Sequence, residues 1–338
     1  MIEPPPWNET YLGGTENAEQ AIFRVMIKEM FAAQQTSTAN LGVDNRPRMM
    51  FGKTVVGITN ASLKMDYIVP ADLAVHHFHP GALLPAIIRL SNASHVPQTD
   101  NAPDLRGLSV RLALPYGIKH DMVFANFPTS LTRNAEQFFQ FSMAQSTDQE
   151  LLFAKLVERL GSRESRRIAM YLKSCFRLCS SLAREHFWSG SAFLWGDRPV
   201  RVELRPTGSL ESPCGTQPTN GDTLRIEFAQ RLACNEIRFR LALQRYVDEK
   251  HTPIEDAAYD WKQSVASPIE IGTLTIPQQD ILGTEGIKVL SQIDKLAFSP
   301  WNAPEKFRPL GSLNRLRRIA YEMGANNRLS RHALRTSV

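Results

Sequence analysis

Cysteine is scarce in this chain. Its 338 residues include four cysteines, at positions 175, 179, 214 and 234, which lie far apart and form no CxxC pair. This number is too small for a disulfide framework in so long a chain, so we expect reduced thiols. Residues 1–10 contain acidic side chains and three prolines where a signal peptide needs a basic and then an apolar stretch, and no apolar run approaches the length of a membrane span. We therefore expect a cytoplasmic protein with no membrane span.

Most of the chain carries almost no net charge of either sign. The formal net charge is +5, and residues 301–338 hold eight Lys or Arg against two Glu, a net +6 that leaves −1 for residues 1–300. A basic end of this kind suits a nucleic acid, a membrane surface, an anionic cofactor or a solvated helix face. The arginines show no aromatic interleaving and no recognisable nucleic-acid-binding motif, so we expect no nucleic-acid partner.

Period-two alternation of apolar residues predicts many half-buried strands. In the clearest case, Val, Val and Leu at 200, 202 and 204 alternate with Arg and Glu. Strands are predicted at 53–59, 86–91, 108–114, 122–126, 200–204, 237–243 and 269–276. Apolar residues at helical spacing predict helices at 17–35, 134–146, 150–160 and 164–184. So many strands predict an α+β fold in which a sheet closes into a barrel and helices are inserted between strands.

The expected organisation is a single domain over residues 1–338. Residues 1–40 form an N-terminal arm with a helix, residues 41–300 the barrel and its helices, and residues 301–338 a last helix with a basic tail. Pro, Gly, Ser and Thr are concentrated in residues 206–222, which predicts a loop inserted within the domain.

Two blocks of sequence resemble the catalase superfamily. The first block contains Ile-Arg-Leu-Ser at 88–91, Asp-Leu-Arg-Gly at 104–107, Asn-Phe-Pro at 126–128 and Arg-Asn at 133–134. In that family, an Arg-Phe-Ser strand, an Asp-x-Arg-Gly strand, an Asn before a Thr-Pro turn and an Arg-Asp helix start follow one another in the same order. Four landmarks in one order are hard to obtain by chance.

The second block resembles the C-terminal signature of the small catalase-like branch of this family. It contains Ala-Phe-Ser-Pro-Trp-Asn at 297–302 and Arg-Pro-Leu-Gly-Ser-Leu-Asn-Arg at 308–315, followed by Arg317 and Tyr321. The resemblance implies an antiparallel eight-stranded catalase-type β-barrel that binds haem b, with a small-molecule peroxide or hydroperoxide as substrate. Because catalases often assemble, it also implies by analogy a homo-oligomer.

The resemblance assigns Tyr321 as the ligand of the haem iron, with Arg317 one helical turn earlier. A phenol with an ordinary pKa near 10 stays ionised only beside a fixed cation and the iron itself. Haem also carries two propionates, whose burial requires paired cations. Arg89 and Arg328 occupy matching positions, and Arg48, or the arginine two residues before it, would supply a third cation.

On the distal side of the haem, the family uses a histidine as general base and an asparagine to orient the peroxide. Asn126 matches the asparagine. Residues 40–60 contain no histidine, and one of Met49, Met50, Phe51 and Gly52 stands where it is expected. Either methionine could place a thioether over the haem as a soft sixth ligand, with plain packing as the alternative.

Three functions are compatible with the matching family residues and the missing distal histidine. The first is a haem oxidoreductase acting on hydrogen peroxide or organic peroxides, with weak catalase activity because the distal histidine is missing. The second is a haem-dependent hydroperoxide isomerase or dehydratase of the allene oxide synthase type. The third is a non-catalytic haem-binding protein with the catalase fold.

A cluster of histidines offers one alternative outside this family pattern. His76, His77 and His79 lie within four residues, and two or three imidazoles at such spacing can ligate zinc or copper. The resemblance places the three at the end of a surface helix, and no thiol lies nearby in the sequence. We therefore expect no metal site there.

Overall fold

The computed structural model describes residues 5–40, 51–94, 98–100, 102–145, 151–208 and 221–335, with the side chains of 34–40 and 324–335 excepted. Within these ranges, nine antiparallel strands form one sheet in the order β5-β4-β3-β2-β1-β9-β8-β7-β6. Their bounds are β1 Lys53–Met65, β2 Leu83–Asn92, β3 Arg106–Ala113, β4 Lys119–Ala125, β5 Phe187–Trp188, β6 Phe193–Trp195, β7 Arg198–Thr207, β8 Ile237–Arg245 and β9 Ile269–Ile276.

The sheet closes into the predicted eight-stranded barrel. A pairing between β5 and β7 joins the two sides of the sheet, and the short strand β6 pairs with another stretch of β7. Alternation places Ile88 and Leu90 of β2 opposite Val110 and Leu108 of β3 in the apolar core, whereas Arg89 lies opposite Ser109 on the other face of the sheet. The period-two pattern of the sequence therefore distinguishes the inside of the barrel from the outside.

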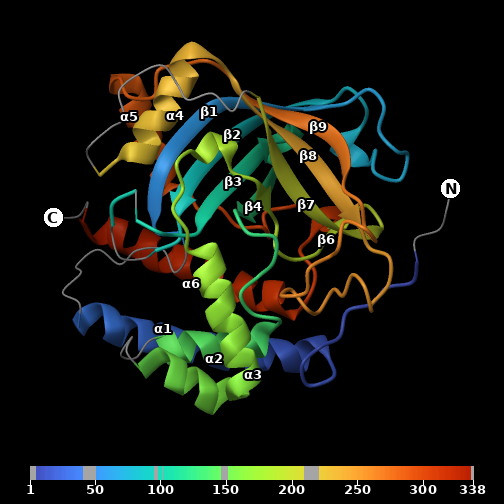
Figure 1. Ribbon diagram of the computed structural model, residues 1–338, viewed down its shortest axis with the longest axis vertical. Coiled ribbons are helices and arrows are strands. Elements are labelled where there is room, and N and C mark those ends of the chain that lie inside the picture. Colours follow the sequence, from blue (N-terminus) through green and yellow to red (C-terminus); the bar gives the residue numbers. More distant parts are fainter. Residues whose placement is uncertain are drawn as a thin grey trace.

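In the described part of the chain, six helices surround the barrel: α1 Glu16–Asn40, α2 Ala135–Gln145, α3 Leu152–Cys175, α4 Thr223–Cys234, α5 Thr284–Lys295 and α6 Ser312–Arg335. In Figure 1, α1, α2 and α3 gather at one end of the barrel, and α6 runs between them and the strands, while α4 and α5 lie beside β1. An apolar cluster fastens this helical layer: Phe23, Ile27 and Met30 of α1 pack with Ala135 of α2 and Leu316 of α6.

The largest difference from the predicted elements concerns residues 150–184. Two helices were expected there, but the chain forms the single helix α3, which is interrupted at Gly161 by a φ of 76°. The helix ends at Cys175, because Arg177 then forms a β-bridge with Asp104, and a short 3₁₀ helix, η4, follows at Leu182–Arg184. Helices α4 and α5 were not predicted, and β7 extends to Thr207, into the predicted 206–222 loop.

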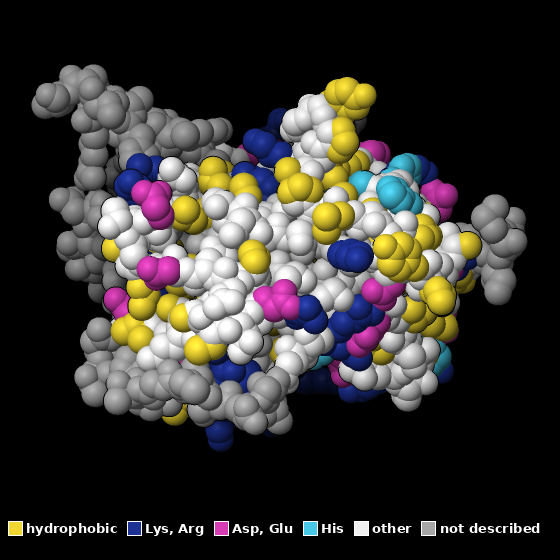
Figure 2. Space-filling view, turned by 90° about the horizontal axis from the view of Figure 1, so that it is seen from above, with side chains coloured by type: hydrophobic (Ala, Val, Ile, Leu, Met, Phe, Trp, Pro, Cys, Tyr) yellow, Lys and Arg dark blue, Asp and Glu magenta, His cyan; other side chains and the backbone are white. Residues whose placement is uncertain are grey.

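Charges of both signs are interspersed on the surface. Figure 2 shows Lys and Arg side chains next to Asp and Glu across one face. Arg240 pairs with Asp66 and Glu270 in this way, and Arg245 pairs with Asp72. Within the described ranges, no helix is long and apolar enough to cross a membrane.

Candidate functional site

The pair predicted to hold iron is formed on α6. Arg317 Nη2 donates a hydrogen bond to the Tyr321 hydroxyl at 3.1 Å, and the guanidinium carbon lies 5.6 Å from the centre of the phenol ring. Arg317 Nε is buried and has no hydrogen-bond partner among the described residues. The arginine therefore retains an unused buried donor beside the phenol, which favours a bound anion at this place.

The side of α6 that carries this pair faces the barrel. Asn314, Arg317 and Tyr321 are spaced i, i+3 and i+7, so they share one stripe of the helix. Asn314 is fully buried and hydrogen-bonds Ser191 and the carbonyl of Ala192, which join β5 to β6. Leu316, by contrast, packs into the cluster with α1 and α2. Arg317 and Tyr321 thus lie on the same side of α6 as Asn314, which contacts the segment between β5 and β6.

Arg89 lies near the end of β2, on its outward face. Its side chain is 2% exposed, and it donates from Nε to Thr54 Oγ1 at 2.8 Å and from Nη2 to the carbonyl of Phe51 at 2.7 Å. Ser91, Gly107 and Ala125 are paired across β2, β3 and β4, so they share a face with Arg89. This surface, which we call the Arg89 face, combines a buried cation with small side chains, so a bulky side chain can pack closely against it.

The side chain of Phe51 packs against the Arg89 face. Its ring lies so close to Gly107 that a Cβ there would stand 2.5 Å from the ring and 2.8 Å from Ser91 Oγ. Phe51 itself adopts a φ of 55°, unusual for a non-glycine residue, and its N–H donates to the carbonyl of Ala93 at 3.2 Å. Phe51 is one of the four residues expected to replace the missing histidine, and its aromatic ring packs on the Arg89 face.

We expect Gly107→Ala to destabilise the fold by about 1–3 kcal/mol, the usual cost of overpacking a tight contact. The added methyl group must displace Phe51, which has a strained backbone, or Ser91, which belongs to a strand. Gly221→Ala is the matched control, because its Cβ would meet only the Thr99 side chain, at 3.1 Å. Urea unfolding measures both variants, and equal midpoints for them would contradict the close packing of Phe51.

Asn126 is fully engaged in the structure. Its Oδ1 accepts a hydrogen bond from the Arg106 N–H at 2.7 Å, and its Nδ2 donates to Glu185 Oε2 at 2.9 Å. Asn126 follows Ala125, so alternation directs its side chain away from the face shared by Gly107 and Arg89. The structure does not bring Asn126 to that face, and its distal role stays a prediction.

The remaining predicted cofactor residues lie outside the described side chains. Arg48, Met49 and Met50 precede the described barrel, and the side chain of Arg328 belongs to the undescribed part of α6. Of the predicted set, the structure therefore brings together Arg317 and Tyr321, and it places Arg89 at the barrel end with Phe51 and Gly52 at the start of β1.

An oriented imidazole was not predicted from the sequence. His186 Nε2 lies 2.8 Å from Oε2 of Glu203, which is 1% exposed, and the imidazole stacks on Trp188 with ring centres 3.7 Å apart. Trp188 is paired with Ala125, so it belongs to the same face of the sheet as Gly107, two strands away. The alternating pattern of the sequence predicted that Glu203 faces away from the apolar side of its strand. No sequence motif identified His186 as its partner.

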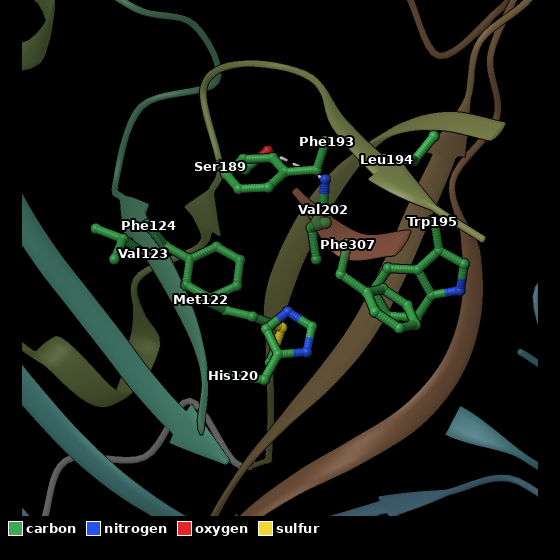
Figure 3. A pocket seen from close by; sticks show the side chains of 10 residues that line it. All are labelled: His120, Met122, Val123, Phe124, Ser189, Phe193, Leu194, Trp195, Val202 and Phe307. Atoms are coloured by element: carbon green, nitrogen blue, oxygen red, sulfur yellow. Dashed lines mark hydrogen bonds between the residues drawn. The ribbon is translucent and has the colours of Figure 1, made fainter. Parts of the chain in front are cut away.

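Two histidines contact each other at the opposite end of β4. His77 Nε2 and His120 Nδ1 are 3.0 Å apart, and Figure 3 shows His120 among apolar side chains, including Phe307 and Trp195. Burial lowers the pKa of His120 to about 3 and that of His77 to about 4, helped in each case by the neighbouring histidines. Both imidazoles are therefore neutral at pH 7.

These histidines do not assemble a metal site. His77 belongs to the 3₁₀ helix η1 (His76–Phe78), where His76 stacks edge-on against Phe307 and His79 faces solvent. In the part of the chain that the structure describes, no three His, Cys, Asp or Glu side chains gather closely enough to hold a metal ion.

Comparison with known proteins gives one relative by sequence and several by structure. No family model matches the chain. A catalase-related peroxidase from Mycolicibacterium paratuberculosis is 27% identical over 208 residues, which cover 59% of this chain and 65% of that protein. The match thus spans slightly less than two thirds of the relative's length.

Solved catalases share the fold. A fungal catalase superposes with a TM-score of 0.64 at 15% identity, covering 93% of this chain and 64% of that one. Catalase A from Saccharomyces cerevisiae gives 0.63 at 13% identity, covering 95% and 67%, and a bacterial catalase gives 0.59 at 18%, covering 83% and 57%. The barrel with its N-terminal helix is therefore the catalase fold.

Proposed function

We propose, from the premise that the chain belongs to the catalase superfamily, that it binds haem b through Tyr321 and acts on hydrogen peroxide or an organic peroxide. The observation that carries this proposal is the hydrogen bond from Arg317 to Tyr321 on the side of α6 that faces the barrel. The 27% identical relative is a peroxidase by name, which supports the same reaction class.

The residues around Tyr321 fit a haem. Tyrosine is an established type of haem-iron ligand, and an anionic oxygen stabilises ferric iron. Arg317 donates to that oxygen, and its buried Nε has a donor left over for a second negatively charged or carbonyl oxygen. A tyrosine that lay in solvent or in a purely apolar core would have no such cation beside its hydroxyl.

Each protein group has a defined task in this proposal. When bound, the haem supplies a redox-active iron that can exchange electrons with a peroxide. Arg317 donates a hydrogen bond to the Tyr321 hydroxyl oxygen and would hold that oxygen in place for the iron. Arg89, already buried, would pair with a propionate, as would Arg328 and Arg48. Phe51 covers part of the Arg89 face and excludes water from it.

A second candidate function is the rearrangement or dehydration of a lipid-like hydroperoxide. The observation that favours it is the Phe51 ring against Gly107, an apolar surface that itself carries no proton acceptor. An apolar wall binds a greasy hydroperoxide better than it binds hydrogen peroxide. Product analysis with a fatty-acid hydroperoxide separates this reaction from peroxidase turnover with a dye.

The test of the iron ligand is Tyr321→Phe. We expect wild-type protein to take up haem with a ferric phenolate spectrum and the variant to lose most of its haem, because phenylalanine offers no oxygen to the iron. Tyr116→Phe is the control, since Tyr116 is 99% exposed and loses the same hydroxyl. An unchanged ferric spectrum in Tyr321→Phe would overturn the ligand assignment, and a wild-type protein that binds haem without turning over any peroxide would leave only the non-catalytic function.

A further inference from the structure

Arg315 lies on α6 two residues before Arg317 and binds carboxylates from distant parts of the chain. Its Nε lies 2.5 Å from Glu19 Oε1, and its Nη1 lies 2.5 Å from Glu9 Oε1 and 3.3 Å from Glu255 Oε1. Its Nη2 donates to the carbonyl of Thr10 at 2.7 Å. Glu9 and Glu19 are almost completely buried, so this cluster is an interior ion network and not a surface pair.

The same carboxylates hold the first turn of α6. Glu9 Oε1 accepts a hydrogen bond from the N–H of Gly311 at 2.9 Å, and Glu255 Oε2 accepts one from the N–H of Ser312 at 2.7 Å. Helix N-termini leave such N–H groups without partners inside the helix, and negative charge is favourable there. The start of α6 is therefore fixed by Glu9, about 300 residues earlier in the chain, together with Glu255.

Three consecutive residues of α6 point in three directions. Their side chains leave the helix about 100° apart, because an α-helix has 3.6 residues per turn. Arg315 faces the carboxylates, Leu316 packs into the cluster with α1 and α2, and Arg317 binds the phenol of Tyr321. Any rotation of α6 about its axis that released Arg315 would also swing Tyr321 away from its present direction.

We infer that the segment from Glu9 to Glu19 is a clamp that sets the rotation of α6, and that Arg315 is a positioning residue for Tyr321. The inference rests on the proposed role of Tyr321 as haem ligand. Removing the guanidinium leaves the buried carboxylate of Glu19 without its cation, whereas Glu9 keeps Arg308 at 2.7 Å. An unpaired buried charge costs more than the loss of an exposed pair. We therefore expect α6 to rotate or to unwind at its N-terminal end, which precedes Arg317.

The test compares Arg315→Gln and Arg315→Lys with the control Glu322→Gln in the full-length, haem-loaded protein. Glu322 lies on the same helix and pairs with Arg318 at the surface, 3.2 Å away, so the control removes an ion pair outside the clamp. We expect haem release to a haem-free globin to be at least about tenfold faster for Arg315→Gln, with a shifted ferric spectrum. Lysine keeps the charge without the planar fork, so Arg315→Lys should be intermediate.

Amide hydrogen exchange tests the clamp without haem. In Arg315→Gln, and more mildly in Glu9→Gln, amides of residues 312–323 should exchange faster, whereas Glu322→Gln should match the wild type. If wild-type protein takes up no haem, the proposed function fails, and exchange still decides whether the clamp exists. Unchanged exchange in both clamp variants would overturn it, and faster exchange with unchanged haem release and spectrum would show that Arg315 does not position Tyr321.

Discussion

Haem-loaded protein is expected to release oxygen from hydrogen peroxide about 10²–10⁴-fold more slowly than a reference catalase, the usual contribution of a positioned general base. That range corresponds to about 3–5 kcal/mol of activation free energy. No imidazole lies within residues 40–60, and Phe51 on the Arg89 face cannot accept a proton. An asparagine carboxamide such as that of Asn126 orients a peroxide but is not a base at neutral pH.

The histidines with described side chains lie elsewhere or are already engaged. His77 and His120 bind each other, and His251 binds Asp248. His186 belongs to the same sheet face as Ala125, so it is the described imidazole best placed to substitute for the missing base. Oxygen evolution per haem in wild-type protein and in His186→Gln decides the matter. A rate equal to that of the reference catalase would contradict the prediction, and its loss in His186→Gln would identify the base.

The barrel could be predicted because its signal is local. The alternation of apolar side chains in 269–276 gave the bounds of β9 as Ile269–Ile276. Strands β5 and β6 contain two and three residues, too few to show a period, so they were not predicted. The end of α3 was misplaced for a related reason: the β-bridge between Arg177 and Asp104 joins residues far apart in the sequence.

The candidate site shows where a motif stops being informative. Arg317 and Tyr321 are one helical turn apart, as the resemblance implied, and the structure shows the hydrogen bond between them. The motif around Asn126 fixed a position in the sequence, but strand register decides which face the side chain takes, and a shift of one residue reverses it. Glu9 and Glu19, two partners of Arg315, lie about 300 residues away in the sequence, and no local pattern could have indicated them.

The largest expected effect on stability comes from the His77–His120 pair as the pH falls. The unfolded chain binds a proton on each histidine below pH 6.5, whereas burial holds the pKa of His120 near 3 and that of His77 near 4 in the folded protein. The unfolded state therefore binds more protons in acid, and stability present above pH 6.5 is lost as the pH falls toward 3. For the fully buried His120 this loss reaches about 4–5 kcal/mol.

We expect the free energy of unfolding of the wild type to fall steeply between pH 6.5 and 4.5, by up to about 1.4 kcal/mol per pH unit for each buried histidine. Glu164 contributes below this window: burial raises its pKa, but Arg133 and Arg167 hold that pKa down to about 2. His120→Gln removes the group with the larger shift, so its stability should depend less on pH over the same range. Urea unfolding at pH 7, 6 and 5 measures this dependence, with His251→Gln, a histidine paired with Asp248 nearer the surface, as control. If His120→Gln kept the slope of the wild type, protonation of His120 could not be the cause of acid unfolding, because the variant lacks that titrating group.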